Sequence, residues 1–480
     1  NGDALDDLKQ RIEPLCHRTL RKQVQQEGGI NFTNRYAITQ DFTPNEAEWA
    51  LYQKVSSYLQ RPDLQAISQQ ARHLVSIGLR KILASSSFAI AETLKGMVER
   101  LRDQQLLTED SLGDLEEADD WLDQFGQVDG DAEPPPEQGK QARLAEEIAL
   151  LSEYQQLAAS ITDNAKGDAL VVVLKRALEM TENLGGQRKA VIFTESCRTQ
   201  QYLDRHLQAH GYTGRTVLLN GSNSDASSKQ IYQAWLQRHA GSGRISGSRP
   251  ADMKAALVEH FKSDQADILI STEAGGEGIN LQFCSVLINY DLPWSPQKVE
   301  QRIGRVHRYG QKHDVVVVNF VNRKNPADQR VFQLLNDKLK LFEGVFGASD
   351  EILGAIADDI DIERRIYDIY QHCRTDAEIE AHFDQLQSDM EAILQVREEH
   401  ARQTLLSHFD HDVVAALKNT RDSSQDFLSS HEQVLLDLAR AELPGAQVER
   451  NHFVYQGQRF DLIWPLVQAN DSEFFRLQTT

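Results

Sequence analysis

Two stretches of the sequence carry residues whose types and spacing suit phosphate chemistry. The first is Ser271-Thr-Glu-Ala-Gly-Gly-Glu-Gly-Ile-Asn-Leu-Gln282, which is typical of a strand that runs into a glycine-rich turn. The second is Gln301-Arg-Ile-Gly-Arg-Val-His-Arg-Tyr-Gly-Gln311, which contains Arg305 and Arg308. Glycine turns let backbone N–H groups approach phosphate oxygens, and guanidinium groups bind such oxygens in pairs. Together the two stretches indicate one half of a nucleotide-driven motor.

The spacing Gln301-x-x-Gly304-Arg305-x-x-Arg308 is the more specific of the two signals. We expect both arginines near the start of a helix, where residues three apart share one face and can reach one target. A triphosphate whose terminal phosphate gains charge during transfer is such a target, and an arginine finger accelerates that transfer by roughly 10³–10⁵-fold. The alternative is a pair of surface salt bridges, and the glycine turn just upstream makes it the weaker interpretation.

An α/β fold with a parallel sheet must position these residues, because helical stretches alternate with short strands that are apolar on both faces. The expected strands are Ala190–Thr194, Arg215–Leu219, Asp267–Ser271, Ser285–Asn289 and Val315–Phe320. The expected helices are Asp168–Leu184, Cys197–His210, Asp225–Arg238, Ala251–Ser263 and Pro296–His307. Ligands of such sheets bind beyond the carboxyl ends of the strands, where we expect both phosphate-binding stretches.

These residues resemble the motifs of Swi/Snf-type superfamily-two helicases. The first stretch is similar to motif V and the second to motif VI, and Asp291-Leu-Pro-Trp-Ser-Pro296 is similar to the element between them. Ala190–Glu195 resembles motif IV, and Leu219–Ser222 resembles the element that follows it. The resemblance covers residues 166–322 and implies the second RecA-like lobe of such a helicase.

The segment after Val331, with Leu341-Phe-Glu-Gly-Val-Phe-Gly-Ala-Ser-Asp350, resembles the RapA-like bacterial branch. The resemblance implies that Arg305 and Arg308 meet the γ-phosphate of ATP and that Gln301 helps to close that site. It also implies that the glycine turn borders the nucleotide through Gly276, Glu277 and Gly278. The implied contacts to a nucleic-acid strand are Thr272, Gly221, Ser222, Thr194 and Trp294. Capping of the sheet's core is an equally good interpretation of Trp294, whereas His307 is better explained as a packed residue than as a catalytic one.

The motifs of the first helicase lobe are absent from the sequence. It contains no Gly-x-x-x-x-Gly-Lys-Ser/Thr and no Asp-Glu-x-His, and the pair Gly139-Lys140 is followed by glutamine. In the family these elements hold the phosphates and Mg²⁺. We therefore expect ATP with Mg²⁺ to be bound mainly by another lobe, and this chain alone to be inactive.

The composition limits which ligands and which cellular compartment suit this chain. At 480 residues with a net charge of −21, the chain is too acidic for indiscriminate nucleic-acid binding. A local basic patch can still act within a Debye length of roughly 8–10 Å, and we expect one in Lys298, Arg302, Arg305, Arg308 and Lys312. Four cysteines without a Cys-x-x-Cys argue against a zinc site and favour the cytoplasm. Because the first residue is Asn1, we expect the ends to be cuts.

Six regions follow from the patterns. We expect residues 1–40 to end the first lobe, 41–106 to be helical and 107–142 to be an acidic linker. Residues 143–347 are expected to form the RecA-like lobe, 348–450 a helical, coiled-coil-like extension, and 451–480 a β-hairpin that starts a further domain. Ile379, Phe383, Leu386, Met390 and Ile393 form a short heptad seam, which favours a helical hairpin within a monomer over a dimer zipper.

Several functions remain compatible with the sequence. The first is an ATP-dependent double-stranded-DNA translocase, acting on RNA polymerase or in phage defence. The second is an interaction scaffold, with residues 360–480 recruiting a nuclease, methylase or polymerase. An RNA helicase is disfavoured by the Asp291–Pro296 element. A dinucleotide-binding enzyme is disfavoured because Gly276-x-Gly278 lacks the third glycine of that fingerprint.

Overall fold

The computed structural model divides the chain into a larger first unit and a smaller second one. Its described residues are 33–61, 64, 66–67, 72–103, 140–308, 310–338, 362–373, 375, 377–392, and the short strands 447–448, 452–455 and 458–461. Residues 1–394 and 395–480 form two compact units, which we treat separately. The expectations for residues 1–32, for most of the acidic linker and for Leu341–Asp350 fall outside the described residues.

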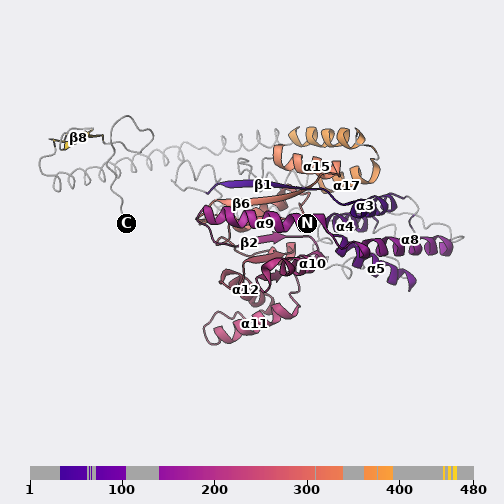
Figure 1. The fold of residues 1–480 in the computed structure, drawn as a ribbon, viewed down its shortest axis with the longest axis horizontal. Coiled ribbons are helices and arrows are strands. Elements are labelled where there is room, and N and C mark those ends of the chain that lie inside the picture. Colours follow the sequence, from indigo (N-terminus) through magenta and orange to yellow (C-terminus); the bar gives the residue numbers. More distant parts are fainter. Residues whose placement is uncertain are drawn as a thin grey trace, which may run out of the picture. The chain divides into compact units, whose positions relative to one another are not determined.

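A six-stranded, fully parallel sheet forms the centre of the first unit (Figure 1). Its strand order is β1-β6-β5-β2-β4-β3. The strands are β1 (Arg35–Phe42), β2 (Ala190–Phe193), β3 (Thr216–Leu219), β4 (Ile268–Ser271), β5 (Val286–Asn289) and β6 (Val315–Asn322). The five strands expected from Gly167 onward are confirmed to within two residues at each end. The intervening helices are confirmed as well, as α9 (Ala165–Asn183), α10 (Cys197–Leu207), α11 (Ala226–His239), α12 (Arg249–Lys262) and α14 (Pro296–Val306).

Strand β1 corrects the expected boundary at residue 40. It pairs in parallel with β6, in register from Arg35 opposite Val315 to Phe42 opposite Asn322. Residues 35–40 therefore belong to the edge of this sheet rather than to the end of a first lobe. The sequence shows a strand there but not its partner, because an edge strand carries no signal of the sheet it joins.

The sheet has a separate apolar core on each face, as expected for strands apolar on both sides. Along β2, Val191 and Phe193 enter one core while Ala190 and Ile192 enter the other. Helices α9 and α10 cover the second face, and α9 crosses in front of the strands in Figure 1. The first face is covered by α12, α14, the helix α15 (Pro326–Gln333), α17 (Ile362–His372) and a helix over residues 377–392.

A third core lies among helices inserted between β1 and β2. These are α3 (Glu46–Leu59), α4 (Arg72–Ser85), α5 (Ser87–Arg102) and α8 (Lys140–Ser160). Helix α4 ends at Ser85, and Ser86 caps α5. Asn45 and Glu48 form the capping box of α3, so Pro44 precedes the helix. Helix α8 starts inside the last residues assigned to the linker.

The seam residues Phe383, Leu386 and Met390 are buried in the core they share with α17, which confirms packing within the chain. Thr375 and Glu378 form a capping box, in which each side chain accepts a hydrogen bond from the backbone N–H of the other residue. In the second unit, β8 (His452–Tyr455) and β9 (Gln458–Asp461) pair as the expected antiparallel hairpin, and β7 (Gln447–Val448) adds a third strand. Among the described residues, none of the helices combines the length and apolar character needed to cross a bilayer.

Candidate nucleotide and nucleic-acid site

The glycine turn after β4 is held tightly against the neighbouring strand end. The hydroxyl of Thr272 accepts a hydrogen bond from the N–H of Gly275, and the N–H of Thr272 donates to the carbonyl of Leu219. A Cβ atom on Gly275 would lie 2.2 Å from that same carbonyl oxygen, so only glycine fits. Lys254 of α12 donates to the carbonyls of Ala274 and Glu277 and fixes the other side of the turn.

A buried arginine that we did not assign to the site connects this turn to α14. The guanidinium of Arg302 is 1% exposed and contacts Glu273 at 2.7 Å and 2.6 Å through two of its nitrogens. Its third nitrogen donates to the carbonyl of Asp291 at 2.7 Å. The signal for this role was present in the sequence, because Arg302 lies one residue before Ile303 on the helix face that buries Val299 and Val306.

The positions of Arg305 and Arg308 differ from the expected ones. Helix α14 ends at Val306, so Arg305 lies in its last turn and Arg308 lies beyond the helix. Arg308 is instead presented by a turn that the side chain of Gln311 closes. The side-chain amide of Gln311 donates to the carbonyl of Val306 at 2.9 Å, and the backbone N–H of Gln311 donates to the carbonyl of Arg308. The helix stops because this side chain satisfies its terminal carbonyl.

Both arginines also lie at the other end of α14 from the one we expected. The helix leaves the carboxyl end of β5 and returns the chain to the start of β6. Arg35, the first residue of β1, donates to Glu300 and to Nδ1 of His307, which confirms that this part of the segment adjoins the amino ends of the strands. His307 is buried and its Nε2 contacts the carbonyl of Thr33, so it is a packed histidine.

The two guanidiniums are available to a ligand. Arg305 is half-buried and Arg308 is exposed, and neither forms an ion pair with an acidic residue in the described parts of the chain. Their neighbours Arg302 and Arg35 are engaged with Glu273 and Glu300. Gln301 and Glu277 are exposed on the same two segments, Gly278 is exposed with a positive φ of 73°, and Gly276 is buried.

Three of the expected nucleic-acid contacts come together at the carboxyl edge. Gly221 and Ser222 are exposed in the loop after β3, whereas Thr272 is buried, at 7% exposed, and adjoins that loop through its backbone hydrogen bond to Leu219. Thr194 and Trp294 are corrected. Thr194 is 0% exposed and donates to Asp291, whereas Trp294 is 9% exposed and stacks on Tyr370 with ring centroids 5.3 Å apart. Both serve the packing of the lobe.

Asp291 is the centre of a buried polar network at this edge. Its carboxylate receives hydrogen bonds from Lys166 at 2.7 Å, Thr194 at 2.6 Å and Ser85 at 2.7 Å. Burial alone would raise the pKa of Asp291, but the ion pair with Lys166 and these hydrogen bonds hold it below its usual value. The network joins α4 and the start of α9 to the strand ends, so the inserted helices are attached to the site.

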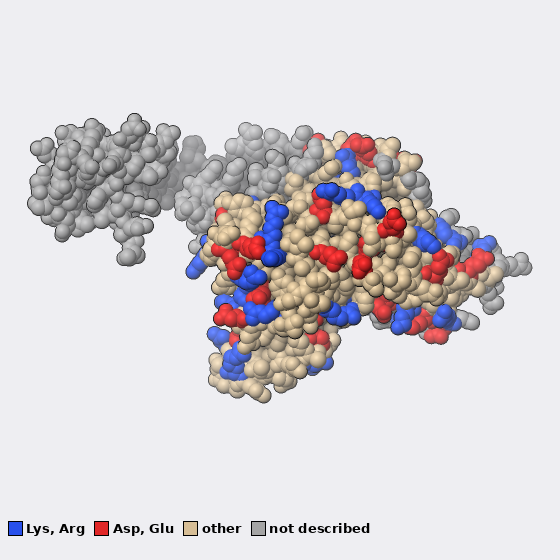
Figure 2. All heavy atoms as spheres, viewed as in Figure 1, with Lys and Arg blue, Asp and Glu red and all other residues tan. Residues whose placement is uncertain are grey.

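The expected basic patch is not continuous. Arg302 is internal, and Lys298 is half-buried, which lowers its pKa. Glu300 is paired with Arg35, and only Arg305, Arg308 and Lys312 remain as accessible members. On the face drawn in Figure 2, acidic and basic side chains are interspersed over the described residues. Any phosphate contact here therefore depends on individual groups rather than on a broad positive field.

Comparison with known proteins identifies this lobe. The family described as helicase conserved C-terminal domain matches residues 169–310, which hold the glycine turn and both arginines. This chain is a relative of the Swi/Snf-type ATP-dependent helicases. The chain is 28% identical over 383 residues to a curated protein of Bacillus subtilis (strain 168) described as an uncharacterized ATP-dependent helicase, YqhH. That match covers 80% of this chain and 54% of the relative.

Other similar proteins match shorter parts of the chain or a lower fraction of its residues. RNA polymerase-associated protein RapA of Pseudomonas aeruginosa (strain LESB58) is 43% identical over 77 residues, which is 16% of this chain and 8% of that protein. The C-terminal part of the Fun30 ATPase domain, a solved structure, aligns with a TM-score of 0.37 and 17% identity, covering 72% of this chain and all of that one. The chain thus spans about half the length, or less, of the curated relatives it matches.

Proposed function

We propose that this chain is the second motor lobe of an ATP-dependent double-stranded-DNA translocase. In this proposal Arg305 and Arg308 bind the γ-phosphate of ATP, and Gln301 and Gly276 to Gly278 line the same site. Thr272, Gly221 and Ser222 grip the strand backbone through neutral hydroxyl and amide groups, which fix register without reading sequence.

One observation carries the proposal. Of the arginines in the motif VI segment, Arg302 is buried against Glu273, whereas Arg305 and Arg308 have no acidic partner among the described residues. An arginine held at a fixed position without a counter-charge is suited to an anion that arrives from outside. The residues present fit the terminal phosphate but not Mg²⁺, because the sequence contains neither the P-loop nor the Asp-Glu-x-His motif.

The proposed mechanism is a cycle of lobe closure. When both arginines contact a triphosphate held by a first lobe, closure is favoured, and once the terminal phosphate is lost that stabilisation ends and the lobes part. The segment from Thr272 to Leu281 connects the two proposed sites. At one end the N–H of Thr272 donates to the carbonyl of Leu219, beside the strand-binding loop, and at the other the N–H of Leu281 donates to the carbonyl of Arg305 at 3.0 Å. Movement at the nucleotide can thus reach the strand-binding loop through one continuous piece of backbone.

The arginine assignment is tested by Arg305→Ala in the full-length protein. We expect ATP turnover to fall by about 10³-fold or more, because the charge that develops on the phosphate is no longer compensated. Duplex affinity should change by less than about twofold, as measured by fluorescence anisotropy. Arg323→Ala is the matched control, because Arg323 is an exposed arginine of the same lobe that pairs with Asp41. An equal loss of DNA binding in Arg305→Ala would contradict the assigned role.

The same proposal requires that the 480-residue chain does not hydrolyse ATP by itself. We expect phosphate release at the background rate with duplex DNA, and turnover only when a polypeptide with a P-loop and magnesium motif is joined to it. Steady hydrolysis by the chain alone would refute this. Comparing duplex DNA with RNA as the activator of the joined protein would decide between a DNA translocase and an RNA helicase. An association with RNA polymerase, suggested by the name of the RapA relatives, belongs to the same proposal.

A further inference from the structure

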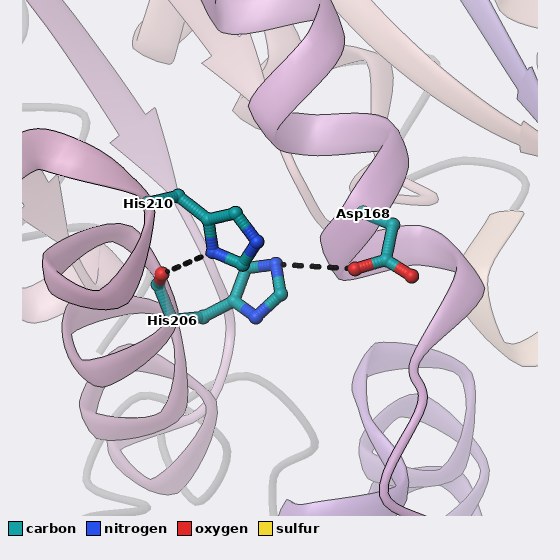
Figure 3. A group of neighbouring side chains, drawn as sticks. All are labelled: Asp168, His206 and His210. Carbon is teal, nitrogen blue, oxygen red and sulfur yellow. Dashed lines mark hydrogen bonds and ion pairs between the residues drawn. The ribbon is translucent and has the colours of Figure 1, made fainter.

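A cluster of metal-ligating side chains lies outside the motor motifs, between α9 and α10. It consists of Asp168, His206 and His210, whose ligand atoms all lie within 4.8 Å of one another (Figure 3). Asp168 belongs to the first turn of α9, His206 to the last turn of α10, and His210, four residues later, to the turn Gln208–Tyr212 that follows α10. In Figure 3 the two imidazoles lie side by side and the carboxylate faces them from the separate helix.

The local structure brings these groups together. The start of α9 lies close to α10, since a Cβ on Gly167 would be 2.1 Å from the hydroxyl of Tyr202 and a larger residue would have to displace that side chain. The ring of His206 packs on Tyr202 with centroids 5.5 Å apart. A π-helical turn over Gln208–Tyr212 then places the ring of His210 at 4.4 Å from that of His206.

The nitrogens are oriented as metal ligands. Nδ1 of His210 lies 2.8 Å from the carbonyl of His206, so its proton is directed there and the lone pair of Nε2 is left for an ion. Nε2 of His206 is buried and has no hydrogen-bond partner of ordinary geometry within the described residues. Its nearest charged neighbour is Oδ1 of Asp168, at 3.5 Å. A buried polar atom without a partner is unfavourable unless something else satisfies it.

We propose that Asp168, His206 and His210 bind a divalent transition-metal ion of the Zn²⁺ class. Ligand atoms at about 2.0–2.2 Å from a tetrahedral zinc ion lie roughly 3.3–3.6 Å apart, and the Asp168–His206 pair already has this spacing. His210 is exposed, so its side chain can close the remaining gap, and water would complete the coordination. Two imidazoles and one carboxylate favour Zn²⁺ over Mg²⁺, which prefers oxygen ligands.

Such an ion would join the two helices that cover one face of the sheet. This role is independent of the ATP site and of the proposed translocase activity. Cysteine spacing argued against zinc in the sequence, but these ligands include no cysteine. The pair His206-x-x-x-His210 was visible there, whereas Asp168 becomes a third ligand only through the fold.

The site is tested on the purified 480-residue chain after removal of metal with a chelator. Zn²⁺ is titrated with calorimetric and thermal-unfolding readouts, and Co²⁺ is used as a spectroscopic probe, with Mg²⁺ as the oxygen-preferring comparison. We expect a site that binds Zn²⁺ and raises the melting temperature. His210→Ala and Asp168→Asn should each weaken that affinity by about tenfold or more, and both residues are exposed, so the variants should fold.

His372→Ala is the matched control. His372 is also exposed and its Nδ1 contacts the carbonyl of Asp368, four residues earlier, but within the part of the chain that the structure describes it belongs to no group of metal-ligating side chains. It should retain Zn²⁺ affinity and ligand-field bands of Co²⁺ equal to those of the unaltered chain. Equal affinity in His210→Ala and in the unaltered chain would overturn the proposal, as would a melting temperature that Zn²⁺ does not change.

Discussion

Arginine has two opposite roles within one short segment of this lobe. Arg302 is fully buried and is held by Glu273 and by the carbonyl of Asp291, so it fixes α14 against the glycine turn. Arg305 and Arg308 are left without such partners among the described residues. The sequence pattern identifies Arg305 and Arg308 as phosphate-binding candidates and Arg302 only as a member of the basic patch, because spacing alone does not reveal which side chain the helix turns inward. Burial separates the residue that builds the site from those that can receive a ligand.

The Asp291–Lys166 pair gives a prediction at the scale of single residues. Asp291→Asn should reduce the free energy of unfolding by about 3–5 kcal/mol at pH 7, because Lys166 keeps a buried charge without its partner. Urea denaturation monitored by circular dichroism measures the difference. Asp384→Asn is the control, since Asp384 pairs with Arg330 at the surface and should change stability by less than about 1 kcal/mol.

The pH dependence of that difference follows from the lowered pKa of Asp291. A carboxyl group whose pKa is lower in the folded than in the unfolded chain stabilises the fold above its ordinary pKa of 3.8. This contribution is lost as the pH falls through the folded pKa. The gap between Asp291→Asn and the unaltered chain should therefore be constant from neutral pH downwards and narrow below pH 3.8. A gap that widens on acidification would contradict the assigned ion pair.

At the scale of elements, the turn after β4 depends on the backbone of a different strand. Gly275→Ala should destabilise the lobe by about 1–3 kcal/mol, since the added Cβ meets the carbonyl of Leu219 and not a flexible side chain. Gly304→Ala is a control from motif VI, because Gly304 lies within α14 and a Cβ there meets nothing within 4 Å. It should be neutral or stabilise the chain by about 0.5–1 kcal/mol. Thermal unfolding of both variants is the measurement, and equal losses would contradict the close approach at Gly275.

The helices and strands were largely predictable from the sequence, but which of their residues are buried and which can contact a ligand was not. The runs at Ala190, Asp267 and Val315 are β-branched and apolar on both faces, a pattern that few folds other than a covered parallel sheet produce. The end of α14 was predicted to within one residue, but the position of the two arginines at that end was not, because helical periodicity does not show that Gln311 closes the turn that carries Arg308. Thr194 was wrongly assigned to the nucleic-acid site because its buried partner Asp291 lies far along the sequence, where local spacing gives no sign of the contact.

At the scale of the whole molecule, the C-terminal helices are part of the helicase lobe. Phe383, Leu386 and Met390 lie in the same core as α14 and α17, so the seam they form is already occupied. This leaves little support for the scaffold hypothesis in residues 377–392, although that hypothesis also included residues that the structure does not describe. The family resemblance was most informative between residues 166 and 322, and least informative where packing between distant segments decides the outcome.

Phe383→Ala tests this arrangement. The side chain is 2% exposed, and its removal should cost about 3–5 kcal/mol in the unfolding of the lobe. Ile379→Ala, at a partly buried position on the same helix, is the control and should cost less. The midpoint of urea unfolding should be independent of chain concentration. A midpoint that rises with concentration would indicate a zipper between two copies instead of a hairpin within one.

The backbone from Thr272 to Leu281 meets the carboxyl edge of the sheet at one end and the carbonyl of Arg305 at the other. In the proposed motor, the fixed length of this segment couples ATP hydrolysis at one end to the contact with the DNA strand at the other. One extra residue inserted beside the exposed Gly278 would leave the groups at each end intact. It would change only how the movement at the ATP site is transmitted to the strand-binding loop. Such a variant would continue to hydrolyse ATP but would translocate less far along DNA for each ATP hydrolysed.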